Sequence, residues 1–224
     1  MAFYHATILP KNLTLFEAQD TLKELYENCV LIGVDEAGRG PLAGPVVAAA
    51  AVLKDVEPKH LNLNDSKKLS EKQREQIFEK LPDCCQYYST GEASAQEIDE
   101  IGILNADFLA MRRALAPITL QLVEQKLPYK ILVDGNLYIR EMEKAVQMPI
   151  IKGDGRVACI AAASIFAKVR RDKLMVEFNE KFPNYGFGKH KGYGTKAHLA
   201  AIEKFGLSEI HRKTFRNTFT KLST

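Results

Sequence analysis

The sequence predicts an α/β fold in which helices cover the faces of a mixed sheet. Two apolar segments separated by only a few residues suit a hairpin-like antiparallel pair of strands, and strand and helix patterns alternate further along the chain. The length of 224 residues and a hydrophobic content of 46% suit one substantial core.

Apolar periodicity predicts the order of the elements. Helices are predicted where apolar residues recur about every 3.6 positions, and strands where short apolar runs end in turn residues. The predicted strands are residues 29–36, 44–53, 84–94, 129–136 and 147–154. The predicted helices are residues 13–28, 70–82, 104–125, 156–178 and a helix that ends at Phe205.

Local signals refine several of these elements. Ser70 and Gln73 form a capping box that opens the second helix. Pro117 is expected to kink or break the third helix. The helix at 156–178 is so apolar that we expect it to be packed on both sides. The segment "GFGKHKGYGT" is predicted to be a glycine-rich basic loop, either a nucleic-acid surface or simply solvated.

The composition favours a cytoplasmic monomer that binds a polyanion. From Lys152 onward the chain has 15 Lys and Arg against 6 Asp and Glu, which leaves 16 against 22 before it. The longest apolar stretch is about half of the roughly 20 residues that a bilayer span needs, and the layout of a signal peptide is missing. The four cysteines lack zinc spacing and are expected to be reduced, and no heptad pattern indicates a dimer.

Four carboxylates are candidates for chemistry. Asp35 and Asp134 end predicted strands, where ligands collect in sheets with parallel strands, and Glu36 adjoins the first of them. Asp172 shares a helical stripe, at steps of four, with two other polar residues, Ser164 and Lys168. If the four acids converge, their repulsion demands cations, and hard oxygen ligands favour Mg²⁺ or Mn²⁺. Two such ions are the usual device for hydrolysis of a phosphodiester.

Each signal also has a structural interpretation when it is taken alone. Asp134 with its following glycine is first of all a turn, Asp35 can cap a turn of helix, and Asp172 can be a surface ion-pair member. "GRGPLAG" and "GDGR" are weak evidence of anion binding, because tight turns use the same residues. His211, ahead of Arg212, is interpreted as a surface or phosphate contact.

Taken together, the motifs resemble the bacterial ribonuclease HII (type 2 ribonuclease H) family. The matching segments follow one another between about residues 30 and 215: "GVDEAGRGPLAGPVVAAAAVL", "NDSKKLS", "VDGN", "IKGD", "AAASIFAKVRRD", "HKGYGTKAH" and "HRKTF". The resemblance implies a ribonuclease H-like fold, with a five-stranded mixed sheet flanked by helices and a small helical C-terminal region. It also implies an N-terminal helical extension (1–29), a catalytic core (30–185) and a basic C-terminal region that completes the substrate site (186–224).

The resemblance assigns roles residue by residue. The family's catalytic, metal-binding acids fall on Asp35, Glu36, Asp134 and Asp172. The family's element that contacts the backbone around a ribonucleotide and senses its 2′-hydroxyl falls on Gly38, Arg39 and Gly40. Tyr193 matches a tyrosine that stacks on the sugar at the RNA–DNA junction. Positions similar to phosphate contacts are Lys67, Ser164 and Lys168.

The function implied is an endonuclease that uses Mg²⁺ or Mn²⁺, with two ions during catalysis. It would cut the RNA strand of RNA–DNA hybrids and single ribonucleotides in duplex DNA, as ribonucleotide excision repair requires, and leave 3′-hydroxyl and 5′-phosphate ends. Two alternatives stay open at this point. Cleavage of all-DNA substrates would favour another ribonuclease-H-fold nuclease, such as a junction resolvase or a transposase-like core. Absence of metal-dependent cutting would favour an inactive hybrid-binding module.

Overall fold

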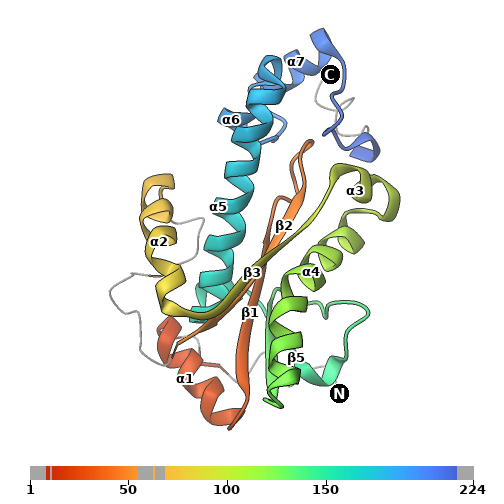
Figure 1. Ribbon diagram of the computed structural model, residues 1–224. Coiled ribbons are helices and arrows are strands. Elements are labelled where there is room, and N and C mark those ends of the chain that lie inside the picture. Colours follow the sequence, from red (N-terminus) through yellow and green to blue (C-terminus); the bar gives the residue numbers. More distant parts are fainter. Residues whose placement is uncertain (1–8, 11, 55–62, 64–68, 216–224) are drawn as a thin grey trace.

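The structure is a computed structural model, and it describes residues 9–10, 12–54, 63 and 69–215. A five-stranded mixed sheet with the order β3-β2-β1-β4-β5 forms its centre (Figure 1). The strands are β1 (Val30–Ala37), β2 (Val46–Leu53), β3 (Cys85–Ala93), β4 (Tyr129–Asp134) and β5 (Gln147–Ile150). The α-helices in the described ranges are α1 (Leu15–Leu25), α2 (Glu71–Cys84), α3 (Ala95–Ile101), α4 (Ile103–Glu124), α5 (Ala158–Lys181), α6 (Phe187–His190) and α7 (Lys196–Phe205).

The strand pairing confirms the predicted mixed sheet. β1 and β2 pair antiparallel, as a hairpin-like connection requires, and β2 pairs antiparallel with β3. β1 pairs parallel with β4, and β4 pairs parallel with β5. The carboxyl ends of β1, β4 and β5 therefore meet at one edge of the sheet.

Two helices cover the sheet from opposite sides (Figure 1). α5 packs on one face together with α1 and α2, and α4 packs on the other. β2 is buried along its whole length, and its four consecutive alanines turn alternately to the two faces. Small side chains on both faces let each helix approach the sheet closely.

The helix α5 approaches β1 closely at Gly33. A Cβ atom added to Gly33 would lie 2.2 Å from the carbonyl carbon of Cys159 and 2.4 Å from the nitrogen of Ile160. A glycine inside a strand often marks such a close backbone contact. Gly33 therefore fixes where α5 sits on the sheet.

The third predicted helix is not broken at its proline. α4 continues through Pro117, because the residues around it are held by the sheet. The Ser89 hydroxyl of β3 donates to the carbonyl of Ala114, and Leu115 and Ile118 are buried against the strands. Tertiary packing thus overrides the local preference.

Three further details differ from the predicted elements. α3 opens with a capping box of Ser94 and Glu97 in a segment for which no helix was predicted. The predicted basic loop contains α6. α5 is packed on both sides only along its first part, because Val176 is 45% exposed.

None of the helices in the described ranges has the length and apolar character that a membrane span needs.

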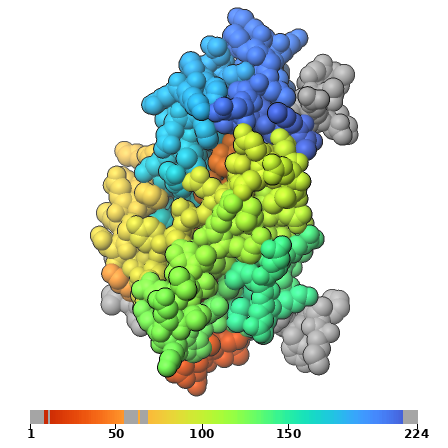
Figure 2. All heavy atoms as spheres, turned by 45° about the vertical axis from the view of Figure 1, so that its right-hand side comes forward, coloured from red at the N-terminus to blue at the C-terminus, as the bar shows by residue number. Residues whose placement is uncertain are grey.

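The C-terminal region forms one end of the molecule (blue in Figure 2) and meets the segment around α3 (yellow-green). The two carboxylate oxygens of Asp99 each accept a backbone N–H at 2.8 Å, from Lys213 and from Thr214. The Gln96 side chain donates to the carbonyl of Glu209 at 3.0 Å. Polar contacts therefore join this region to the rest of the fold.

We expect Gly33→Ala to lower the free energy of unfolding by about 1–3 kcal/mol or more, because the added methyl group overlaps the backbone of α5. Urea denaturation followed by circular dichroism measures this change. Gly188→Ala is the control, since its methyl group would meet only the Asn179 side chain, at 3.3 Å, and should change stability by no more than about 0.5 kcal/mol. Equal stability of Gly33→Ala and the native chain would contradict this packing.

Candidate metal and nucleic-acid site

Three carboxylates gather at the sheet edge where β1, β4 and β5 end. One oxygen each from Asp35, Asp134 and Asp154 lies within 4.8 Å of the others, and we refer to these residues as the three-acid group. Val34 is opposite Val133 in the parallel pair, so the next residues, Asp35 and Asp134, come side by side. Asp154 arrives on a 3₁₀ turn, η3 (Gly153–Gly155), that follows β5.

Backbone hydrogen bonds fix the η3 turn against Asp134. The Oδ1 atom of Asp134 accepts the N–H of Gly153 at 2.6 Å and that of Asp154 at 3.3 Å. A Cβ atom on Gly153 would lie 2.6 Å from the Ile160 side chain and 3.3 Å from this carboxylate oxygen. Glycine at this position lets the turn approach closely enough to bring Asp154 in.

Asp35 is the most buried member of the group, at 3% exposure. Burial raises its pKa well above the usual range, and the charges of Glu36 and Asp134 raise it further. Hydrogen bonds from the Ser164 hydroxyl and the Glu36 N–H act in the opposite direction. Burial and repulsion both disfavour the charged form, so a divalent cation with oxygen ligands suits this group.

The structure brings two of the four predicted acids into the three-acid group and adds one that the sequence analysis missed. Asp172 is not a member, because its Oδ1 atom accepts a hydrogen bond from Lys168 Nζ at 2.7 Å further along α5. Asp154 could have been predicted in the same way as Asp35 and Asp134, because it follows β5, the next parallel strand, and ligands collect at the carboxyl ends of parallel strands. The sequence analysis instead interpreted "GDGR" as a turn or a phosphate-binding helix start.

Glu36 lies beside the group and faces a neighbouring cavity that Asp134 also lines. Its Oε1 atom is 3.4 Å from Arg39 NH1, and Arg39 Nε is 3.5 Å from the Oδ2 atom of Asp107. Asp107 of α4 is 2% exposed, and its Oδ1 atom has no hydrogen-bond partner among the described residues. Burial first, and then the charge of Glu36, raises the pKa of Asp107 to about 8, against the opposing effect of Arg39. No sequence pattern distinguishes this acid, which lies within an amphipathic helix.

Ser164, Lys168 and Asp172 lie along α5 as predicted, but Ser164 contacts the three-acid group whereas Lys168 and Asp172 contact each other. Ser164 is 3% exposed and donates to Asp35, whereas Lys168 points to Asp172. Lys67, the remaining predicted phosphate contact, lies outside the described residues. The stripe therefore connects the three-acid group with a cavity lined by Asp172 and Lys191.

Three of the substrate residues expected from the resemblance, Arg39, Gly40 and Tyr193, lie together at the surface. Arg39 and Gly40 are exposed, and a Cβ atom on Gly40 would lie 3.8 Å from the Tyr193 ring. Tyr193 is 47% exposed, while its backbone carbonyl is bonded to His198 Nδ1 at 2.9 Å. The ring is therefore presented at the surface by a fixed main chain.

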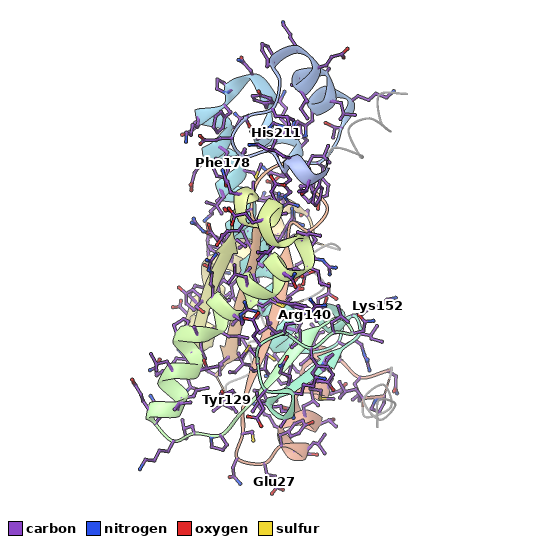
Figure 3. The ribbon with its side chains drawn as sticks, turned by 90° about the vertical axis from the view of Figure 1, so that its right-hand side faces the viewer. Glu27, Tyr129, Arg140, Lys152, Phe178 and His211 are labelled. Atoms are coloured by element: carbon purple, nitrogen blue, oxygen red, sulfur yellow. The ribbon has the colours of Figure 1, made fainter. Side chains whose placement is uncertain are left out.

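The expectation that His211 is a surface or phosphate contact is wrong. His211 is 1% exposed, and Figure 3 shows it inside the C-terminal region, far from Tyr129 at the start of β4. Its Nε2 atom is 3.0 Å from Nε2 of His198, and its Nδ1 atom accepts the Ser208 N–H at 2.8 Å. Burial lowers the pKa of both histidines to about 4. The neutral pair stabilises the segment that carries Tyr193.

Known proteins resemble this chain over most of its length. The family model described as Ribonuclease HII matches residues 32–221. The ribonuclease HII of Fusobacterium nucleatum is 52% identical over 191 residues, which are 85% of this chain and 86% of that protein. The enzyme of Coxiella burnetii is 46% identical over 190 residues, 84% of this chain and 89% of that protein. The ribonuclease HII of Archaeoglobus fulgidus, solved in complex with PCNA, superimposes with a TM-score of 0.67 at 27% identity and covers 82% of this chain and 94% of that one.

The three-acid group predicts stabilisation by Mn²⁺. An ion present at 100 times its dissociation constant should add about 2.7 kcal/mol, and it should raise the midpoint of thermal unfolding accordingly. Asp154→Asn should lose most of this rise, because it removes one of the converging charges. Asp172→Asn, the matched control outside the group, should keep it. A full rise in Asp154→Asn would exclude Asp154 as a ligand.

The histidine pair predicts an acid-labile C-terminal region. The folded-state pKa values of about 4 lie below the ordinary 6.5, so the unfolded chain takes up these protons first as the pH falls. The contribution of each histidine to stability is complete above pH 6.5 and is lost as the pH falls toward 4, by about 3 kcal/mol per histidine. Urea denaturation at a series of pH values should show a smaller loss in His198→Gln. Identical losses in the two proteins would refute this origin.

Proposed function

Because the chain belongs to the ribonuclease HII family, whose members are type 2 ribonuclease H endonucleases that act on RNA–DNA hybrids, we propose that it cleaves with divalent metal ions at the three-acid group. We include single ribonucleotides embedded in duplex DNA among its substrates. The observation that carries the proposal is the convergence of oxygens from Asp35, Asp134 and Asp154 within 4.8 Å.

The metal-binding residues we propose are the three-acid group and Glu36. These residues would hold Mg²⁺ or Mn²⁺, which would provide an activated water for attack on the phosphodiester and a counter-charge for the leaving oxygen, giving 3′-hydroxyl and 5′-phosphate ends. Asp35 is the most buried of these residues, and Ser164 and the Glu36 N–H hold its carboxylate by hydrogen bonds. Asp134 keeps its position through the N–H groups of η3.

Asp172 has a different role in this proposal. Its hydrogen bond with Lys168 holds the ammonium group at a fixed place on α5, four residues beyond Ser164, which bonds to Asp35. We therefore assign Lys168 to a phosphate contact and Asp172 to its positioning. Lys67 is proposed as a second phosphate contact on the resemblance alone.

The substrate surface consists of the glycine-arginine-glycine element and Tyr193. Gly38, Arg39 and Gly40 directly follow β1, so they leave the sheet beside the three-acid group. Arg39 and Gly40 are exposed, and their backbone next to the Tyr193 ring suits contact with a sugar and its 2′-hydroxyl, which distinguishes RNA from DNA. The region from 186 onward thus completes the substrate site of the core.

One chain contributes all of these residues, so we propose a monomer.

α1 packs on the core, where the Gln19 side chain accepts the Cys159 N–H at 2.8 Å, and it takes no part in the site. The cysteines of the described chain are free thiols, in keeping with a cytoplasmic location. An enzyme of this kind would serve ribonucleotide excision repair.

Cleavage of a duplex with one embedded ribonucleotide tests the proposal. We expect cutting with Mg²⁺ or Mn²⁺ and none in EDTA, and we expect the matching all-DNA duplex to stay intact. Asp154→Asn should lower the rate by about 100-fold or more, as the loss of one charge-stabilising group does elsewhere. Asp172→Asn should lower it far less. Undiminished cutting in EDTA, or equal cutting of the all-DNA duplex, would defeat the proposal.

A further inference from the structure

Two buried arginines lie behind the 38–45 loop, the segment that joins β1 to β2. Arg171 of α5 is 1% exposed, and Arg212, which follows α7, is 0% exposed. Their side chains donate only to backbone carbonyls. Arg171 donates to Pro45, Lys191 and Ala43 at 3.1, 3.0 and 3.2 Å, and Arg212 donates to Gly44, Arg39 and Gly38 at 2.9, 2.9 and 2.6 Å.

Neither guanidinium forms an ion pair with a carboxylate in the part of the chain that the structure describes. Burial lowers the pKa of Arg171 to about 10 and that of Arg212 to about 9, so both stay charged at neutral pH. A buried cation without a counter-ion costs stability, and apolar contacts would hold a merely structural loop at lower cost. The two arginines therefore serve to hold the backbone of the 38–45 loop in one particular conformation.

Arg212 determines which way two peptide units of the loop face. It holds the carbonyls of Gly38 and Arg39, and no peptide bond in the described ranges is cis. The C=O and N–H of a planar trans peptide point in opposite directions. The N–H groups of Arg39 and Gly40 consequently point away from the buried guanidinium, toward the exposed side.

These two N–H groups are available to a ligand. Arg39 and Gly40 are exposed, and neither N–H has an acceptor within the described ranges. Two successive N–H groups on one side form the kind of concavity that binds electron-rich oxygens. The Tyr193 ring lies on the same side, next to Gly40.

Arg171 also holds the segment that carries Tyr193. Arg171 holds the carbonyl of Lys191, and the Leu42 N–H donates to the carbonyl of Gly192 at 2.9 Å. A Cβ atom on Gly192 would lie 2.4 Å from the oxygen of Ala43. The loop and the tyrosine are therefore held in one fixed relation.

The two glycines of the element have different functions in this arrangement. A Cβ atom on Gly38, whose φ is +101°, would lie 2.0 Å from Nε of Arg171, so this glycine makes room for a buried cation. At Gly40 the added atom would meet only the Tyr193 ring, at 3.8 Å. Only Gly40 keeps the substrate side open.

We propose that Arg212 is a specificity-determining positioning residue, which holds the carbonyls of Gly38 and Arg39 and so directs the N–H groups of Arg39 and Gly40 toward the ribose 2′-hydroxyl. The inference rests on the proposed function. A ribose oxygen accepts these hydrogen bonds, whereas deoxyribose leaves both donors unpaired at a site that the sugar has shielded from water. A site built to bond a hydroxyl rejects the analogue that lacks it.

The test compares binding to two duplexes that differ only in one ribonucleotide, measured by fluorescence anisotropy with Ca²⁺ in place of Mg²⁺. Two hydrogen bonds should give the native chain a preference of about 10- to 100-fold for the ribonucleotide. Arg212→Lys keeps the positive charge but cannot span three carbonyls, so its preference should fall to within about threefold of none while its affinity for the all-DNA duplex is nearly unchanged. Lys213→Met, which removes an exposed neighbouring charge, should weaken both duplexes alike and keep the preference.

An unchanged preference in Arg212→Lys would overturn the inference, as would an equal loss of affinity for both duplexes. Hydrogen exchange of the native chain decides the matter if this variant does not fold. The amides of Arg39 and Gly40 should gain protection with the ribonucleotide duplex and not with the all-DNA duplex, and the same protection with both would refute the inference. Failure of the native chain to cut the ribonucleotide duplex with Mg²⁺ would instead refute the proposed function.

Discussion

The seating of α5 on β1 at Gly33 is the contact on which the rest of the structure depends. The absence of a side chain there brings the helix backbone against the strand, and three polar side chains then extend from the helix along its length. Ser164 reaches Asp35, Lys168 pairs with Asp172, and Arg171 passes behind the 38–45 loop. One strand–helix contact therefore sets the acids, the stripe of α5 and the loop relative to one another.

The second organising feature is charge that the protein leaves uncompensated. Burial and repulsion raise the pKa of Asp35 and Asp107, while the two buried arginines hydrogen-bond to carbonyls and form no ion pair with a carboxylate within the described chain. Both arrangements oppose stability. On the proposed function, divalent cations would relieve the repulsion at Asp35, and the N–H groups that Arg212 directs outward would bond an oxygen of the nucleic acid.

The sequence was sufficient for the order of the elements, the mixed sheet and the pairing of Asp35 with Asp134, because these follow from periodicity and from the rule for parallel strands. It was not sufficient to show that Asp154 joins the three-acid group or that Asp172 lies outside it. Residues eight apart on one helical stripe are about 12 Å apart along the axis, so a shared stripe does not mean a shared site. The buried roles of His211 and Arg212 depend on contacts with the distant 38–45 loop and α7, which no local pattern encodes.

The central claim is that Asp35, Asp134 and Asp154 share divalent ions while Asp172 binds none. Anomalous diffraction from crystals soaked in Mn²⁺ locates the ions directly. The account predicts a peak in contact with carboxylate oxygens of Asp35 and of at least one of its two partners in the three-acid group. A peak at Asp172 with none at the three-acid group would contradict it.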